Sequence, residues 1–278
     1  MKLCSHIRFD LSNGLVKHGM PIRYIVWCLF FILASIEFSG KLSSFEIQQY
    51  SYGDYLLYIF GGMREYIPDP NDPFRIPYLW LINHLGILYF TLHYMHDDLV
   101  NFGQQTILRS KSRTAWWLSK CIWNFSIVVI FYIISWIIVF LCAFLNQANF
   151  SFRISPYMSE LMIFGPQQIP VSFWPITIEI TVLPLLITLT MSIIQMTLSL
   201  FLNPMICYII STITLISSAY YLSPFLIGNY AMALRSDKVV TNGVDPIEGI
   251  LISLIFIAIS VFSGMHIFKK HNILNEEA

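Results

Sequence analysis

The sequence predicts an all-α membrane protein with six transmembrane helices, and three observations support this fold class. Hydrophobic residues make up 56% of the 278 residues and charged residues only 12%, whereas soluble domains carry roughly 25% charged residues. Uncharged apolar runs of about 20 residues, long enough to cross a bilayer, recur along the chain. The charges between these runs are distributed asymmetrically. We expect one transmembrane domain over residues 1–278, with spans at about residues 24–40, 76–96, 116–145, 178–202, 205–226 and 249–268.

The N-terminal segment, residues 1–23, carries four basic residues among spaced apolar positions. This pattern is typical of an amphipathic helix on a membrane surface. The apolar run that follows, residues 24–40, is the first predicted span. A cleaved signal peptide is the alternative for this region, but the basic stretch is long and the run is rich in bulky aromatic residues.

The next segment, residues 41–75, is polar and ends in a proline-rich stretch that cannot form a regular helix. Within it, the aromatic residues 52–63 are consistent with a short interfacial helix. Residues 76–96 then contain no Asp, Glu, Lys or Arg, and Pro77 suits the start of a helix. They form the second predicted span.

The third predicted span, residues 116–145, follows a basic loop and falls mostly in the uncharged stretch 121–152. Residues 153–175 are broken by several prolines but stay apolar around 161–164, so we expect an interfacial or re-entrant segment there. The uncharged stretch 180–234 is long enough for two spans, with Asn203-Pro204 as the turn between them. A polar loop, residues 227–248, precedes the sixth span.

The distribution of charge predicts the orientation. Six spans place both termini and the loop 97–115 on one side of the membrane. The regions on that side, counted through Lys120, hold ten basic and five acidic residues, and the opposite side holds six basic and eleven acidic residues. Because positive charge marks the cytoplasmic side, we expect cytoplasmic termini and extracytoplasmic segments at 41–75, 146–177 and 227–248.

Several function classes lack their usual signals. The phosphate-binding Gly-x-x-x-x-Gly-Lys-Ser/Thr sequence of ATPases is absent. Spans three to six carry no ionisable residue in their cores, which disfavours an ion-coupled transporter, although the histidines of span two keep that alternative open. His93 and His96 lie beside two aspartates, but a polar boundary at the membrane surface explains them better than a metal site. No arrangement suggests an intramembrane enzyme, the third alternative. We therefore predict no catalytic, cofactor-binding or metal-binding residues.

A small set of polar or helix-bending residues within the spans is predicted to line a pathway or act in gating. Pro184 removes a backbone donor and should bend the fourth span. Hydrogen bonding between helices is the alternative role for the polar members. The set comprises His84, Tyr89, Pro184, Gln195, Ser199 and Tyr208.

The loop after the second span is the most informative stretch. It contains Asp-Asp-Leu at 97–99, Gly-Gln-Gln at 103–105, Arg-Ser-Lys-Ser-Arg at 109–113, Trp-Trp at 116–117 and Lys120. With the surface helix before span one and the six-span layout, this loop resembles that of the type-2 ABC exporter permeases. Looser similarity extends to residues 195–204 and 228–235. The proline-broken segment between spans three and four departs from the family, which often places its re-entrant pair between spans five and six.

The resemblance implies a cytoplasmic coupling helix that docks into a separate ATPase subunit. The residues assigned to this contact are Asp97, Asp98, Leu99, Val100, Phe102, Gly103, Arg109 and Arg113. It also implies two ATPase copies that bind ATP and Mg²⁺, a second permease copy forming a homodimer or heterodimer, and no cofactor or nucleic acid bound by this chain. An ordinary basic loop in contact with anionic lipid is the alternative.

We therefore expect a permease of an ATP-driven exporter in a plasma membrane, as in a bacterial cell. The apolar, aromatic spans favour an amphipathic or hydrophobic substrate, such as an antimicrobial peptide, a lipid or a drug.

Overall fold

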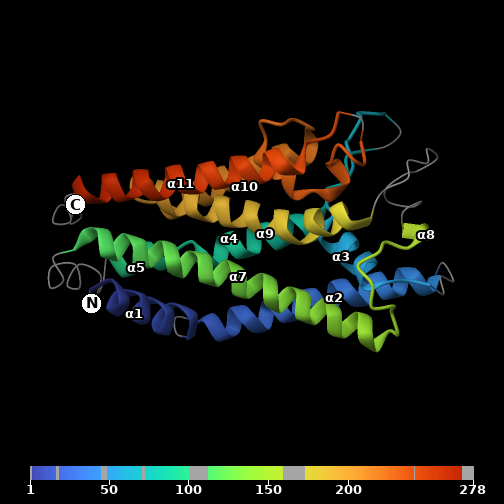
Figure 1. The fold of residues 1–278 in the computed structure, drawn as a ribbon, viewed down its shortest axis with the longest axis horizontal. Helices are drawn as coiled ribbons and strands as arrows, with labels where there is room; N and C mark the ends of the chain where they lie inside the picture. The colour runs from blue at the N-terminus through green and yellow to red at the C-terminus, as the bar shows by residue number, and fades with distance from the viewer. Residues whose placement is uncertain are drawn as a thin grey trace.

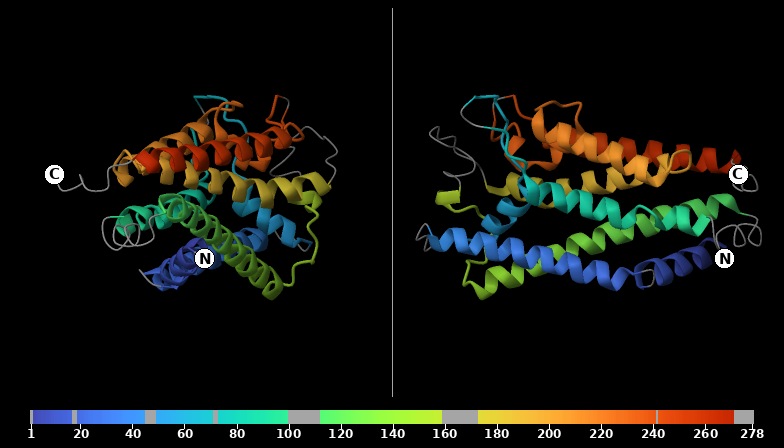
Figure 2. Two further views of the ribbon diagram at one scale, coloured as in Figure 1. Left: turned by 60° about the vertical axis from the view of Figure 1, so that its left-hand side comes forward. Right: turned by 180° about the vertical axis from the view of Figure 1, so that it is seen from behind.

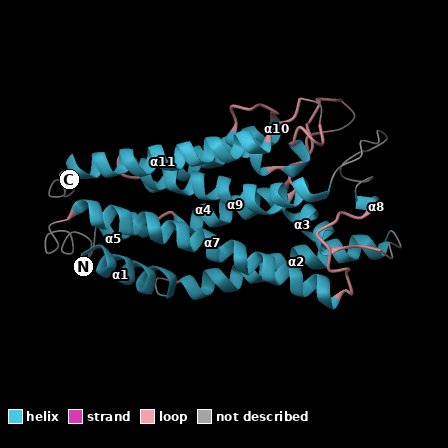
Figure 3. Ribbon diagram, viewed as in Figure 1, coloured by secondary structure: helices cyan, strands magenta, loops and turns pink. Residues whose placement is uncertain are grey.

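The computed structural model describes residues 2–16, 19–44, 49–70, 73–99, 112–158, 173–240 and 242–270. It is an elongated bundle of helices, and the part of the chain that it describes contains no β-strand (Figures 1 and 3). The predicted all-α class is therefore confirmed for these residues. The long helices are α2 (Met20–Ser44), α4 (Tyr78–Thr91), α7 (Arg113–Leu145), α9 (Phe173–Leu198), α10 (Pro204–Tyr220) and α11 (Pro246–Lys270).

Short helices lie at the two ends of the bundle. The chain termini and α5 (Tyr94–Asp98) lie at one end, and α3 (Tyr52–Phe60) and α8 (Pro156–Met158) lie at the other (Figures 1 and 2). The 3₁₀ helices at Ile227–Ala231 and Ala233–Arg235 follow α10. The first described helix, α1 (Lys2–Val16), and the end of α11 thus lie at the same end of the bundle.

Within the described residues, four helical segments are long and apolar enough to cross a membrane: Met20–Ser44, Arg113–Leu145, Glu179–Leu198 and Pro246–Lys269. These segments coincide with predicted spans one, three, four and six. Predicted spans two and five are shorter than expected. Helix α4 has 14 residues and α10 has 17, which correspond to about 21 and 26 Å against a hydrocarbon core of about 30 Å.

Local hydrogen bonds account for these shorter helices. After α4 the Leu92 N–H donates to the carbonyl of Tyr89, which tightens the helix into a turn before α5. Helix α10 begins at Pro204, with the Asn203 side chain accepting from the Met205 N–H, as the predicted turn requires. It ends before Tyr221, whose backbone is extended.

The N-terminal helix α1 (Lys2–Val16) forms where a surface helix was predicted, but it packs against α7. Helix α7 has 33 residues, about 50 Å, so it is about 20 Å longer than a hydrocarbon core. Its excess length at the Arg113 end provides the surface that α1 covers. One face of α1 therefore contacts protein (Figure 1).

Helix α3 lies near one end of the bundle, but its side chains are mostly buried between the longer helices rather than exposed on the surface. Its N-terminus carries a capping box, in which the Ser51 hydroxyl accepts from the Asp54 N–H and the Asp54 carboxylate accepts from the Ser51 N–H. The second carboxylate oxygen of Asp54 accepts from the Ser155 N–H at 2.8 Å. Asp54 therefore ties α3 to the segment after α7.

Aromatic packing and small residues set the close helix contacts. Trp27 of α2 is buried against Phe31 and Phe131, and its indole N–H donates to Ser135 of α7 at 2.9 Å. At the other end of α7, Gly264 of α11 faces Trp117, and a Cβ at position 264 would overlap that indole ring. This glycine is what allows α11 to approach α7.

Candidate functional site: a buried ionic network beside the predicted coupling loop

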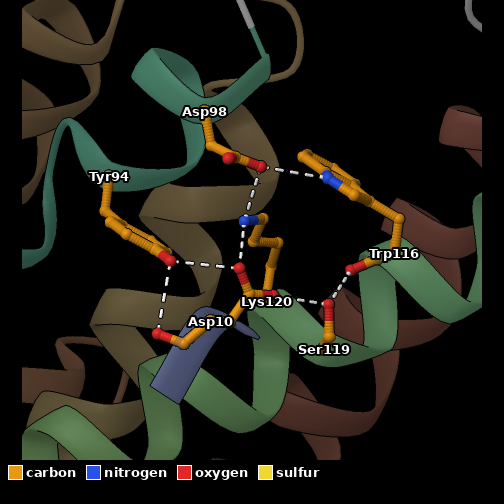
Figure 4. A network of polar contacts seen from close by, with 6 residues as sticks. All are labelled: Asp10, Tyr94, Asp98, Trp116, Ser119 and Lys120. Atoms are coloured by element: carbon orange, nitrogen blue, oxygen red, sulfur yellow. Dashed lines mark hydrogen bonds and ion pairs between the residues drawn. The ribbon is translucent and has the colours of Figure 1, made fainter. Parts of the chain in front are cut away.

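A network of charged side chains lies where α1, α5 and α7 meet (Figure 4). The Lys120 ammonium of α7 is 2.6 Å from a carboxylate oxygen of Asp10 in α1 and 2.6 Å from one of Asp98 in α5. The exposed side-chain fractions are 1% for Lys120, 3% for Asp10 and 13% for Asp98. The three charges are therefore largely removed from water, and each depends on the others for compensation.

Neutral donors complete the network (Figure 4). The Ser119 hydroxyl donates to Asp10 at 2.6 Å, and the Tyr94 hydroxyl donates to the other oxygen of Asp10 at 3.0 Å. The Trp116 indole N–H donates to Asp98 at 3.1 Å. The Lys120 ammonium also lies 4.7 Å from the Tyr94 ring centroid and 5.1 Å from that of Trp116, which is within cation–π range.

His6 lies one helical turn before Asp10 and is also buried. Burial lowers the pKa of His6, and the neighbouring Asp10 raises it to a smaller extent. The imidazole is thus disfavoured as a second cation. Lys120 remains the cation in direct contact with both carboxylates.

The predicted coupling residues have different surroundings. Asp97 is exposed and Asp98 belongs to the ionic network. Leu99 is only 4% exposed and packs in a cluster with Trp116 and Phe268, so its side chain does not lie on the surface of this chain. Val100, Phe102, Gly103 and Arg109 lie outside the described residues.

Arg113 joins the far end of the same loop to another helix. Its guanidinium donates to the carbonyls of Phe268 and Lys269, the latter at 2.8 Å, in the last turn of α11. A cation there is favourable because the carbonyls at a helix C-terminus carry partial negative charge. Arg113 thus fixes α7 to α11.

The predicted pathway residues mainly connect helices. His84 of α4 is buried, with Nδ1 at 2.6 Å from the hydroxyl oxygen of Thr188. The Gln195 amide donates to the carbonyl of Leu88 and its oxygen accepts from Ser211, so it joins α4, α9 and α10.

The remaining predicted pathway residues make an edge-on aromatic contact or hydrogen bonds to residues nearby in the chain. Tyr208 of α10 packs edge-on against Tyr89 of α4, with ring centroids 5.8 Å apart. The Ser199 hydroxyl donates to the carbonyl of Met196. The carbonyl of Pro184 accepts from Thr188, and α9 continues as a helix through this proline.

A second buried cation, Arg235, lies at the opposite end of the bundle. Its guanidinium donates to the carbonyls of Ser218, Ala219 and Tyr221 at the C-terminus of α10, and to that of Met63. Burial lowers the pKa of Arg235 to about 10, so it stays charged at neutral pH. The contact closes the α10 end with a positive charge.

The sequence did not identify the ionic network as a unit. Asp10, Ser119 and Lys120 are separated from Asp98 by intervening segments, and only the fold brings them together. The residue that could have indicated the network is Lys120, a lone cation at the start of a long apolar run. A charged residue in such a position is rare unless a partner of opposite charge lies beside it. Among the described residues, no three His, Cys, Asp or Glu side chains are grouped so that they could hold a metal ion.

A family model described as "Protein of unknown function (DUF2705)" matches residues 47–274. The match begins after α2 and includes Lys120 and Asp98 but not Asp10. No curated protein sequence matches the chain.

Proposed function

This chain belongs to the DUF2705 family, and we propose that it is the membrane-spanning permease subunit of an ATP-driven ABC exporter. In this proposal it moves an amphipathic or hydrophobic substrate out of the cell. Two copies of an ATPase subunit bind ATP and Mg²⁺, and a second permease, identical or homologous, completes the complex.

The observation that supports the proposal is how the predicted coupling loop, residues 97–115, is anchored. At its start, Asp98 is held by Lys120 and Trp116 of α7. At its end, Arg113 is bound to the last carbonyls of α11. A loop that transmits the motion of a partner must be rigidly joined to the membrane helices, because a flexible joint would absorb the displacement.

The buried charges make this joint stiff and cooperative. If Asp98 moved away, the Lys120 ammonium, whose side chain is only 1% exposed, would lose one of its two carboxylate partners while still buried. Lys120 is also bound to Asp10 of α1. Breaking one member of such a buried group costs about 3–5 kcal/mol. A force on the loop would therefore move α1, α5 and α7 together.

The proposal includes six membrane crossings with both termini in the cytoplasm. Helix α4 is short alone, but α4, the turn at 92–93 and α5 together cover 78–98, about 31 Å of helix. Helix α10, at about 26 Å, crosses with its Arg235-capped end in the outer interfacial region. The positive charge bias assigns the α5 end of the bundle to the cytoplasm.

A photocrosslinking experiment tests the proposal. A photoreactive amino acid replaces Asp97, which is exposed at the α5 end, in the full-length chain in native membranes. The matched control carries it at Ile67, which is 75% exposed in the segment before α4. Crosslinking from position 97 to a subunit with the ATPase phosphate-binding sequence, and none from 67, is expected.

A companion measurement separates the alternatives. The purified complex should hydrolyse ATP, and the chain alone should not. Absence of an ATPase crosslink at position 97, or transport driven by a proton or sodium gradient in liposomes holding this chain alone, would overturn the proposal in favour of an ion-coupled transporter.

A further inference from the structure

A cavity of about 370 Å³ lies among α9, α10, α11 and the 3₁₀ helix after α10. Its size is within the ~300–1,000 Å³ range of small-molecule sites. Met191 and Leu198 of α9 both line it, so it extends over about 10 Å of that helix. It reaches the surface between α10 and α11, where the lining residues Ile210 and Phe256 are 41% and 45% exposed.

The lining selects for hydrocarbon. Nine of the twelve lining residues carry no side-chain polar oxygen or nitrogen, and the other three are Ser211, Thr214 and Tyr230. Each of these hydroxyls already donates within the chain: Ser211 to Gln195, Thr214 to the carbonyl of its own α10, and Tyr230 to a loop carbonyl. With its hydroxyl hydrogens used internally, the cavity offers no free donor to a sugar or another polar ligand.

Two acidic residues, Asp245 and Glu248, lie beside the cavity at the start of α11, near the lining residue Tyr230. Glu248 precedes the lining residues Ile252 and Phe256 by one and two turns, so all three share a face of α11. Tyr230 lines the cavity and packs on Gly249; burial raises its pKa, and Glu248 and Asp245 raise it further. Glu248 is exposed, and no basic side chain within the described ranges lies within 4.0 Å of its carboxylate.

We propose that this cavity binds an amphipathic cation, with its hydrocarbon chain between α9, α10 and α11 and its charged head beside Glu248. A hydrocarbon occupant suits the cavity, because an apolar lining does not hold water stably and loses nothing to an apolar ligand. The negative mouth then favours a cationic head over an anionic one. The claim that such a cation is the substrate of the exporter rests on the proposed function. Binding of the cation to the cavity can be measured without an ATPase.

The test uses the full-length chain alone in nanodiscs of zwitterionic phosphatidylcholine. The probe is tetradecyltrimethylammonium with a diazirine at the end of its chain, and tetradecyl sulfate with the same diazirine is the matched anion. Labelled residues are mapped by mass spectrometry. The cation should label α9, α10 or α11 within the cavity, saturably and more strongly than the anion.

Two variants locate the site. Thr214→Phe fills the cavity and should reduce labelling by the cation about tenfold, whereas Ile213→Phe, at a position 59% exposed on the outside of α10, should leave it unchanged. Glu248→Gln should reduce labelling by the cation about fivefold and leave that by the anion unchanged. Glu65→Gln, at another exposed acid, controls for net charge.

Three results would overturn the inference. Equal labelling by the anion removes the charge selectivity. Labelling that Thr214→Phe does not reduce places the probe elsewhere. Loss of self-association in Thr214→Phe with unchanged labelling shows that a second copy of the chain occupies the cavity. If the cavity is labelled as expected but the crosslinking experiment at position 97 finds no ATPase partner, the binding site stands and the proposed function falls.

Discussion

Replacing Lys120 by Met should destabilise the protein strongly, because the change keeps an unbranched side chain but leaves Asp10 and Asp98 buried without their cation. Each 2.6 Å contact contributes about 6 kcal/mol of attraction at an effective dielectric of ~20, much of which desolvation offsets. The expected net loss is about 3–5 kcal/mol. For a chain of this size, that lowers the melting temperature by roughly 6–20 °C.

The assay is thermal unfolding in one detergent, followed by tryptophan fluorescence. The matched control is Lys41→Met, since Lys41 pairs with Glu37 at 2.9 Å but the two side chains are 51% and 37% exposed. Exposed pairs contribute about 0–1 kcal/mol, so the control should melt within about 4 °C of the wild type. Similar shifts for the two variants would show that the network is hydrated and refute the reasoning.

Neutralising the whole network distinguishes charge from packing. The triple variant Asp10→Asn, Asp98→Asn, Lys120→Met removes the unpaired charges, so it should be more stable than Lys120→Met alone. A triple variant that is less stable by the sum of three independent losses would show that the three residues are not coupled.

Four further substitutions have expected outcomes in the same assay. Gly264→Ala should destabilise by about 1–3 kcal/mol because its Cβ would overlap Trp117, whereas Gly40→Ala, with no atom within 4 Å of the added Cβ, should stabilise α2 by about 0.5–1 kcal/mol. Arg235→Lys should cost about 2–4 kcal/mol, since an ammonium cannot reach the carbonyls that the planar guanidinium joins; a neutral effect would show that they are solvated. Ser51→Ala removes the cap of α3 and should cost about 1 kcal/mol, and an unchanged melting temperature would show that the cap is dispensable.

Where tertiary contacts determine the end of a helix, the observed boundary differs from the one predicted from the sequence. The hydropathy pattern located α2, α7, α9 and α11 because a run of apolar residues marks a helix whatever its neighbours are. The same pattern overestimated α4, which turns at Leu92, and α10, whose end at Tyr220 coincides with the Arg235 contacts.

The candidate site was predictable only in part. The sequence drew attention to Asp97 and Asp98 as neighbours in a loop, but it treated them alike. In the structure Asp97 is exposed while Asp98 binds Lys120. Leu99 is buried against Trp116 for the same reason: α5 turns one face toward α7, and the direction of that face depends on the turn at 92–93.

The sequence by itself determined the apolar character of the long segments, the helical class and the uneven distribution of charge, because those properties follow from composition and from the spacing of apolar and charged residues along one chain. Only the tertiary structure decided which charges meet. Asp10, Asp98 and Lys120 come from three segments, and burial makes their pairing obligatory. The physical reason is that hydrophobicity is a local property of a segment, whereas compensation of a buried charge depends on the atoms that other segments bring to it.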